Sequence, residues 1–227
     1  MDIREKIGQV LERIERARRR SSFSQSVRLV AVTKGVDVSL IRTAASEGLQ
    51  EFGENRVQES ASKIMTLSSL RWHMIGHLQT NKVRQALELF GLIQSVDRPS
   101  LVEAIDREAK RLNKTIQVLI QVNTQEGPSK FGFLPETLLR TLETITPLGS
   151  LKVFGLMTLA PPLADPQESR PFFRKLRSLR EQAETEKFPN CDLSILSMGM
   201  SQDFEIAIEE GSNMVRIGTA IFGERQR

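Results

Sequence analysis

Cysteine, tyrosine and long apolar runs are what this sequence most lacks. Cys191 is the only cysteine, so the chain cannot form an internal disulfide, and this fits a reducing compartment. We expect Cys191 to pack in a buried strand rather than to react. No apolar run approaches the length of about 18 residues that a membrane span needs, and the amino-terminal segment is too charged for a signal peptide. These absences predict a cytoplasmic protein without a membrane association.

The charge balance gives little support for nucleic-acid binding. The formal net charge is only +4, and the one basic cluster lies near the end of the first helical segment, at Arg16, Arg18, Arg19 and Arg20. Cations at that end of a helix interact favourably with its dipole. No aromatic side chains alternate with the basic ones and no nucleic-acid reading motif accompanies them, so we expect no nucleic-acid partner.

The composition is that of a globular chain with a packed core. Hydrophobic residues make up 39% and charged residues 26% of the 227 positions. This length lies within the range in which an α/β barrel forms one domain. We therefore expect a single domain over residues 1–227.

Short apolar runs alternate with helical patterns along the whole chain. The first helical pattern follows Asp2, a plausible cap, and its apolar stripe is Ile3, Ile7, Val10, Leu11 and Ile14. Later helical patterns end at Gly48, open at Pro99 and Pro135, or end at Gly211. The apolar runs read as strands buried on both faces, at 27–33, 50–53, 71–75, 91–96, 115–122, 151–157, 193–197 and 213–217.

Eight buried strands that alternate with helices predict a (β/α)₈ barrel of the TIM type. The alternative is a doubly wound open sheet, because the pattern does not show whether the first and last strands pair. Little sequence remains after the eighth strand, so we expect the amino-terminal helix to cover the place of an eighth helix.

In such a barrel the chemistry lies at the carboxyl ends of the strands. Lys34 follows the first strand, where partial burial would favour the neutral amine that attacks an aldehyde. Glycines and hydroxyls after strands seven and eight could hold a phosphate, at 197–201 and 216–219. The other polar or notable strand-end residues are Asn55, His77, Asn123 and Met157.

Two further pairs of residues could indicate a metal site or an acid/base pair. His73 and His77 have the spacing of metal ligands on a helix, but the segment reads as a strand and no ligand cluster accompanies it, so we expect no metal site. Glu51 and Glu54 could form an acid/base pair, although glutamates in structural ion pairs are commoner.

Six segments give the chain a strong resemblance to the pyridoxal phosphate homeostasis protein family, which is related to the amino-terminal barrel of bacterial alanine racemase. They occur in order and at the expected spacing, at 29–34 (LVAVTK), 52–55 (FGEN), 72–82 (WHMIGHLQTNK), 155–158 (GLMT), 197–201 (SMGMS) and 216–223 (RIGTAIFG). One irregularity is the stretch 123–130, where Pro128 departs from the family pattern and puts the shape of that loop in doubt.

The resemblance implies a fold-type III barrel that binds pyridoxal 5′-phosphate (PLP) as a Schiff base on Lys34. It places Arg216 opposite the ring nitrogen, Asn55 near the ring hydroxyl, and His77 and Met157 in the pocket lining. The phosphate would be held by Ser197, Ser201, Gly218 and Thr219. The family is associated with vitamin B6 and amino-acid homeostasis rather than with a defined reaction.

The absence of tyrosine argues against the reaction of the related enzyme. Alanine racemase has an additional β domain and takes its second base, a tyrosine, from the partner subunit, whereas this chain has neither. We therefore expect a monomeric PLP carrier without catalytic turnover, whose recipients are PLP-dependent enzymes. The alternatives are a low-activity PLP-dependent amino-acid racemase and an interaction protein that keeps the fold without the cofactor.

Overall fold

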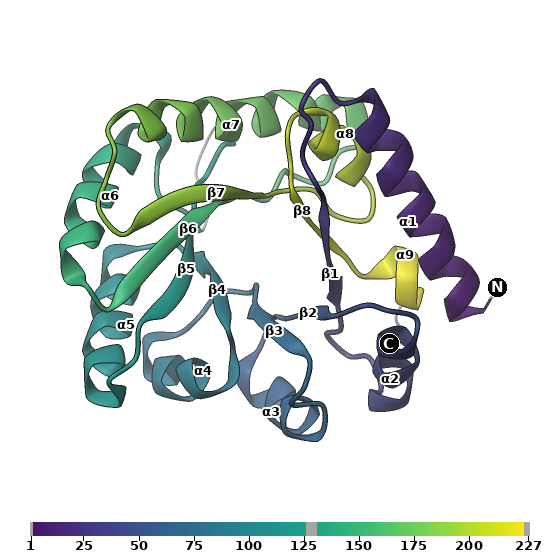
Figure 1. Cartoon of the computed structure of the whole chain (residues 1–227), viewed down its shortest axis with the longest axis horizontal. Coiled ribbons are helices and arrows are strands. Elements are labelled where there is room, and N and C mark those ends of the chain that lie inside the picture. Colours follow the sequence, from purple (N-terminus) through teal and green to yellow (C-terminus); the bar gives the residue numbers. More distant parts are fainter. Residues whose placement is uncertain (1, 126–130, 225–227) are drawn as a thin grey trace.

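The computed structural model describes residues 2–125 and 131–224, and in these residues eight parallel strands form a closed barrel (Figure 1). Each strand pairs with the next one along the chain, and β8 pairs with β1 through four residue pairs from Arg28↔Met214 to Ala31↔Ile217. The strands are β1 Arg28–Val32, β2 Glu51–Glu54, β3 Arg71–Met74, β4 Leu92–Val96, β5 Ile116–Gln121, β6 Leu151–Met157, β7 Cys191–Ser197 and β8 Met214–Ile217.

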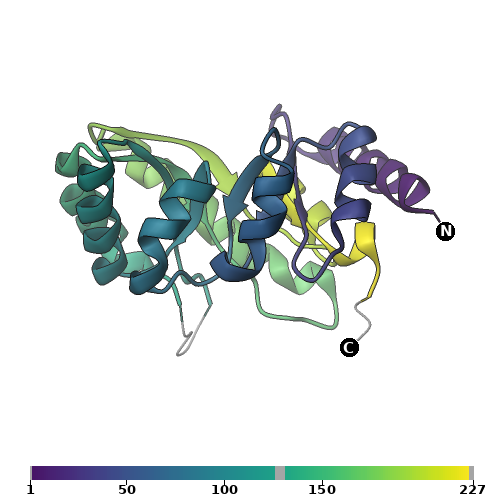
Figure 2. The ribbon, with the colours of Figure 1, turned by 90° about the horizontal axis from the view of Figure 1, so that it is seen from below.

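Helices separate the strands and surround the barrel (Figure 2). The α-helices are α1 Ile3–Arg20, α2 Val38–Ser46, α3 Val57–Thr66, α4 Val83–Leu89, α5 Pro99–Leu112, α6 Leu138–Ile145, α7 Arg170–Thr185, α8 Phe204–Glu209 and α9 Thr219–Phe222. Short 3₁₀ turns precede or follow some of them: η1 Thr80–Lys82, η2 Pro135–Thr137, η3 Thr146–Leu148 and η4 Pro166–Ser169. In the described residues no helix is long and apolar enough to cross a membrane.

The predicted barrel is confirmed, and the open-sheet alternative is wrong because β8 pairs with β1. All eight predicted strands are present, with ends within two residues of the predicted ones. Pro99 occupies the first turn of α5, as expected, whereas Pro135 opens a 3₁₀ turn that leads into α6. Gly48 and Gly211 follow helix ends with φ of +94° and +98°, a region that favours glycine.

Helix α1 covers the place where an eighth barrel helix would lie, and the short helix α9 fills the rest of it. In Figure 1, α1 packs beside α8 and α9. The side chain of Asp2 caps α1 by accepting a hydrogen bond from the amide of Ile3. The predicted apolar stripe is correct except at Leu11, which is largely exposed; Ala17 completes the buried face instead.

A small cluster of buried apolar side chains is separate from the main core and consists of Val30, Leu92, Leu119, Met157, Ile195 and Met214. Gly155 lets β6 and β7 approach closely at a register shift, because a Cβ at this position would collide with the carbonyl oxygen of Ile195.

Other sequence predictions are refined by the fold. Cys191 begins β7 and is half-buried rather than buried. Burial, with a smaller effect of Asp192, raises the pKa of its thiol to about 12, so the thiol stays protonated.

Arg18 and Arg19 pair with Glu15 on α1 itself, while Arg20 binds Glu209 on α8. Three of the four arginines in the basic cluster are therefore engaged in ion pairs with the protein's own carboxylates.

Candidate functional site

A cavity of about 700 Å³ opens at the carboxyl ends of the strands. Besides apolar residues of the segment that follows β6, it is lined by seven of the nine predicted site residues: Lys34, Asn55, His77, Ser201, Arg216, Gly218 and Thr219. The remaining two, Met157 and Ser197, are fully buried and do not line the cavity. The direction shared by all strands of a parallel barrel explains why residues so distant in sequence meet here.

Lys34 lies two residues after β1, is half-buried, and faces the cavity with its side chain unpaired. No hydrogen bond or ion pair joins its ammonium to another residue within 2–125 and 131–224. The nearby buried carboxylate of Glu54 is neutralised by Lys63, whose Nζ lies 2.9 Å from Glu54 Oε1, and also accepts a hydrogen bond from Thr33. Lys34 therefore remains available to react with a ligand.

Arg216 is buried at the end of β8 and held by two hydrogen bonds. One guanidinium nitrogen donates to Ser197 Oγ at 2.5 Å and the other donates to the carbonyl oxygen of Thr158 at 2.8 Å. Burial lowers the pKa of Arg216 to about 10, with the carboxylate of Asp203 acting in the opposite direction. The side chain is therefore a cation of fixed orientation at neutral pH.

A chain of buried hydrogen bonds continues from Arg216 into the barrel. Ser197 donates to Gln94 Oε1 at 2.6 Å, and the amide nitrogen of Gln94 lies 2.8 Å from His73 Nδ1. Burial lowers the pKa of His73 to about 3, helped by the positive charges of Arg28 and Arg71, so His73 is neutral and can accept this hydrogen bond. The hydroxyl of Ser197 is thus occupied by two protein partners.

Glu51 and Glu54 lie in separate structural ion pairs, which is the commoner of the arrangements considered for them. Glu51 binds Arg28 and Arg71 at one end of β2, and Glu54 binds Lys63 at the other end. In the described part of the chain, no three histidine, cysteine or carboxylate side chains gather into a possible metal site.

Ser201, Gly218 and Thr219 form a polar corner where the turn after β7 meets the start of α9. Ser201 Oγ accepts hydrogen bonds from the amides of Gly218 at 3.3 Å and Ala220 at 3.4 Å. Gly218 packs tightly against β1, because a Cβ there would lie 3.2 Å from the Val32 carbonyl oxygen. The hydroxyls of Ser201 and Thr219 therefore lie at this corner of the cavity, and both can donate to an oxyanion.

Asn55 and His77 also line the cavity. The buried Oδ1 of Asn55 has no hydrogen-bond partner, which is costly for a buried acceptor unless a ligand satisfies the side chain. His77 binds the carboxylate of Asp97, which follows β4, at 2.8 Å. Asn55 and His77 also border a second cavity of about 440 Å³. The two cavities share Asn55, Gly76 and His77 as lining residues.

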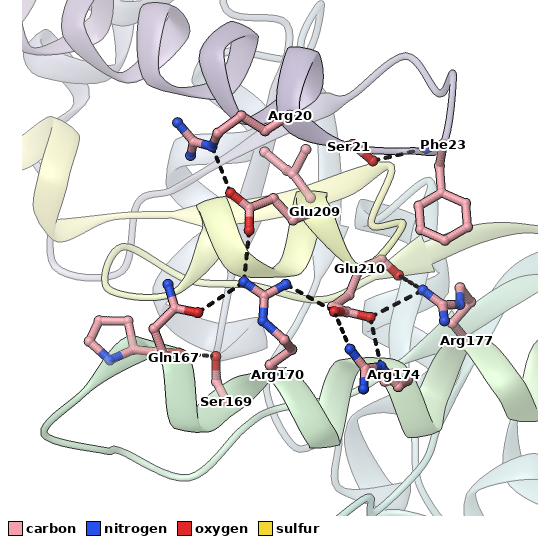
Figure 3. Close-up of polar contacts among 12 residues, drawn as sticks. Arg20, Ser21, Phe23, Gln167, Ser169, Arg170, Arg174, Arg177, Glu209 and Glu210 are labelled. Carbon is pink, nitrogen blue, oxygen red and sulfur yellow. Dashed lines mark hydrogen bonds and ion pairs between the residues drawn. The ribbon is translucent and has the colours of Figure 1, made fainter.

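The segment between β6 and α7 forms one wall of the cavity and is anchored by a cluster of ion pairs (Figure 3). Arg170 at the start of α7 bonds to Glu209 at 2.8 Å and to Glu210 at 2.9 Å, and Arg174 and Arg177 also bind Glu210. Burial alone would raise the pKa of Glu210, but the hydrogen bonds from Arg174 and Arg170 outweigh it and lower the pKa. The cluster ties the cavity wall to α8, and Arg20 extends it to α1.

Four polar residues at or behind the cavity did not emerge from the sequence. Gln94 and Thr158 hold Ser197 and Arg216, Asp97 holds His77, and Asp203 lines the cavity with a pKa that burial raises. Gln94 lies within a predicted strand and Asp97 directly follows it, and this position was the one sequence feature that could have identified them as site residues. The stretch 123–130, expected to deviate in shape, lies outside the described residues from 126 onward.

Comparison with known proteins gives a consistent family assignment. The family model of the alanine racemase N-terminal domain matches residues 7–226. The chain is 44% identical over 229 residues to the pyridoxal phosphate homeostasis protein of Aquifex aeolicus, covering 100% of both, and 38% identical over 230 residues to that of Haemophilus influenzae, covering 99% and 97%.

Solved structures agree with this assignment. The fold matches PipY of Synechococcus elongatus PCC7942 with PLP bound at a TM-score of 0.85 and 34% identity, covering 98% of this chain and 100% of PipY. Alanine racemase of Clostridium difficile 630 matches at a TM-score of 0.76 and 14% identity over 98% of this chain and 58% of the racemase, a likeness of fold alone. The chain therefore belongs to the pyridoxal phosphate homeostasis protein family, whose barrel is that of the alanine racemase N-terminal domain.

Proposed function

We propose that this protein binds PLP covalently through Lys34 and holds it for vitamin B6 and amino-acid homeostasis without turning over a substrate. The observation that carries the proposal is the unpaired Lys34 ammonium in a cavity that also contains a buried cation and a corner of oxyanion donors. The names of the relatives and the PLP-bound PipY structure point to the same ligand. PLP supplies an aldehyde that condenses reversibly with a primary amine.

The donors in the cavity suit the three polar parts of the cofactor. Ser201, Gly218 and Thr219 would hold the phosphate, since two hydroxyls and the backbone of a glycine line that corner of the cavity. Arg216 would face the ring nitrogen. Asn55 would bind the ring hydroxyl, which would give its side-chain Oδ1 the hydrogen-bond donor that it lacks. His77 would line the pocket, and Ser197 and Met157 would act from beneath it, Ser197 by orienting Arg216.

A buried cation opposite the ring nitrogen weakens the ring as an electron sink but does not by itself exclude carbanion chemistry, since the related racemases share the arginine and still turn over substrate. Arg216 disfavours protonation of that nitrogen, and an unprotonated ring is a weaker electron sink. This argument is supported by the absence of tyrosine from the sequence, because a two-base racemase that uses tyrosine cannot be assembled from this chain or from two copies of it. We infer that the chain acts as a monomer and passes PLP to PLP-dependent enzymes.

The attachment site can be tested by trapping the bond with borohydride. After incubation with PLP and reduction, peptide mapping should find the pyridoxyl label on Lys34, and Lys34→Ala should lose the visible absorbance of the Schiff base. Lys82→Ala is the matched control, since Lys82 lines only the adjoining cavity. A label on Lys82 or Lys130 in the wild-type protein would contradict the assignment.

A further inference from the structure

Asp97 carries a buried charge for which the proposed function has no use. It directly follows β4, and its side chain is only 1% exposed. One carboxylate oxygen lies 2.8 Å from His77 Nδ1, and the other accepts a hydrogen bond of 2.5 Å from Arg98. Arg98 is fixed in turn by donating to the carbonyl oxygen of Leu78 at 2.8 Å. A carboxylate held this rigidly has the means to orient the imidazole that it contacts.

The ring of His77 is held through its Nδ1 edge and is partly exposed. Nδ1 points to the buried Asp97, and the side chain of His77 as a whole is 34% exposed. The ring of Phe131 packs on its face, with ring centroids 4.2 Å apart. His77 lines the same cavity as Lys34, and within residues 2–125 and 131–224 no hydrogen bond or ion pair joins its Nε2 to another residue.

The hydrogen bond to Asp97 also selects the tautomer of His77. A carboxylate accepts from Nδ1–H, which leaves a lone pair on Nε2 of the neutral ring. Arg98 lies on the same side of the ring, with its nearer nitrogen 3.5 Å from Nδ1, and binds the other oxygen of the Asp97 carboxylate. This is the arrangement of a base with its orienting group, placed in a cavity that contains an amine nucleophile.

We propose that His77 and Asp97 form a proton-transfer pair that accelerates both the attachment of PLP to Lys34 and its release. The inference rests on the proposed function of Lys34. Attachment joins Lys34 Nζ to the aldehyde carbon and expels the aldehyde oxygen as water: the nitrogen loses two protons, the oxygen gains two, and nothing is oxidised or reduced. His77 Nε2 relays a proton between the nitrogen and the oxygen, directly or through one water, and release follows the same route in reverse. Asp97 is the positioning residue.

This activity would make the chain a rapid exchanger of PLP rather than a passive store. A group that only transfers protons accelerates attachment and release equally, so it leaves the equilibrium constant unchanged. A residue that merely braces the cavity wall, or that contacts the bound ligand, changes affinity instead, chiefly through the release rate. The ratio of the two rates therefore separates the roles.

The experiment is stopped-flow absorbance at the Schiff-base band, for attachment after mixing with PLP and for release into an excess of a trapping apoenzyme. In His77→Ala we expect both rates to fall by about 10- to 100-fold, within the range of general acid–base catalysis, with the dissociation constant within about threefold of wild type. In Asp97→Asn, attachment and release should slow by the same factor. Gln79→Ala, beside the adjoining cavity and outside the proposed pair, should match wild type.

Rescue of the rates by added imidazole distinguishes a proton-transfer role of His77 from a purely structural role. Added imidazole should restore both rates of His77→Ala in a saturable way and should leave wild type unchanged. A change confined to release, an affinity loss equal to the rate change, unchanged rates, or slow rates that imidazole does not restore would each overturn the proton-transfer pair. Borohydride labelling of Lys34 in the same samples keeps this separate from the proposed function, which fails only if wild type forms no bond there.

Discussion

Arg216 donates a 2.5 Å hydrogen bond to the hydroxyl of Ser197, which in turn donates to Gln94. This contact places Ser197 beneath the cavity, as a support for the cation above it. It also continues into a chain of buried hydrogen bonds that reaches His73. Each member of such a chain depends on its neighbours, because a buried polar atom that loses its partner keeps the cost of its lost hydration.

Replacement of Ser197 by alanine should destabilise the protein by about 1 to 3 kcal/mol, because Gln94 Oε1 loses its donor and Arg216 loses an acceptor. Urea unfolding of the protein without PLP measures this. Ser194→Ala is a matched control on the same strand, since the side chain of Ser194 is exposed, and it should change stability by less than about 0.5 kcal/mol. Equal effects of the two substitutions would contradict a supporting role for the Ser197 hydroxyl.

The double variant Ser201→Ala with Thr219→Ala should weaken PLP much more than pyridoxal. Each lost hydrogen bond to a charged phosphate costs about 1.5 to 3 kcal/mol of binding free energy. Pyridoxal lacks the phosphate and makes none of these hydrogen bonds, so its affinity should change little. Titration of both vitamers, followed by absorbance, gives the difference, and Ser68→Ala at an exposed position serves as the control. Equal losses for PLP and pyridoxal would place the phosphate elsewhere in the cavity.

Stability should fall in mild acid because His73 is buried in its neutral form. Burial lowers the pKa of His73 from 6.5 to about 3, so between these values the unfolded chain binds a proton that the folded chain does not. Stability from this residue is present above pH 6.5 and is lost as the pH falls. From pH 7 to 5 the loss should be about 2 kcal/mol.

Urea unfolding at the two pH values, compared with His73→Gln, isolates this contribution. The variant should lose about 2 kcal/mol less than wild type between pH 7 and 5, whatever its stability at pH 7. His77→Gln changes a histidine that is partly exposed and serves as the comparison. Parallel stability curves for wild type and His73→Gln would show that His73 titrates normally in the folded state.

The PLP-loaded protein should be monomeric and should show no physiologically meaningful racemase, transaminase or decarboxylase turnover. Light scattering tests the first expectation, and chiral analysis of amino acids after long incubation at high protein concentration tests the second. Spectral changes on adding amino acids would not count as turnover, because a Schiff base exchanges with free amines. A stable dimer that covers Lys34, or Lys34-dependent turnover of about 1 per second or more, would favour an enzyme.

Sequence alone determined the alternation of strands and helices, and with it most of the candidate site. Strands buried on both faces leave continuous apolar runs, and all strands of a parallel barrel end at the same face. Residues directly after those runs, such as Lys34, Asn55 and Gly218, could therefore be assigned to the same end of the barrel from the sequence alone. The matching segments added the identity of the ligand that the cavity would take.

Only the tertiary structure decided which way the side chains near those strand ends point. Both faces of a barrel strand are buried, so apolar periodicity does not distinguish the barrel interior from the helix-facing side, and Ser197 could not be separated from Ser201 by position. Closure of the barrel depends on the pairing of β1 with β8, which lie at opposite ends of the sequence. The hydrogen bond of His77 to Asp97 joins two strand ends in the same way, through a contact that no local pattern encodes.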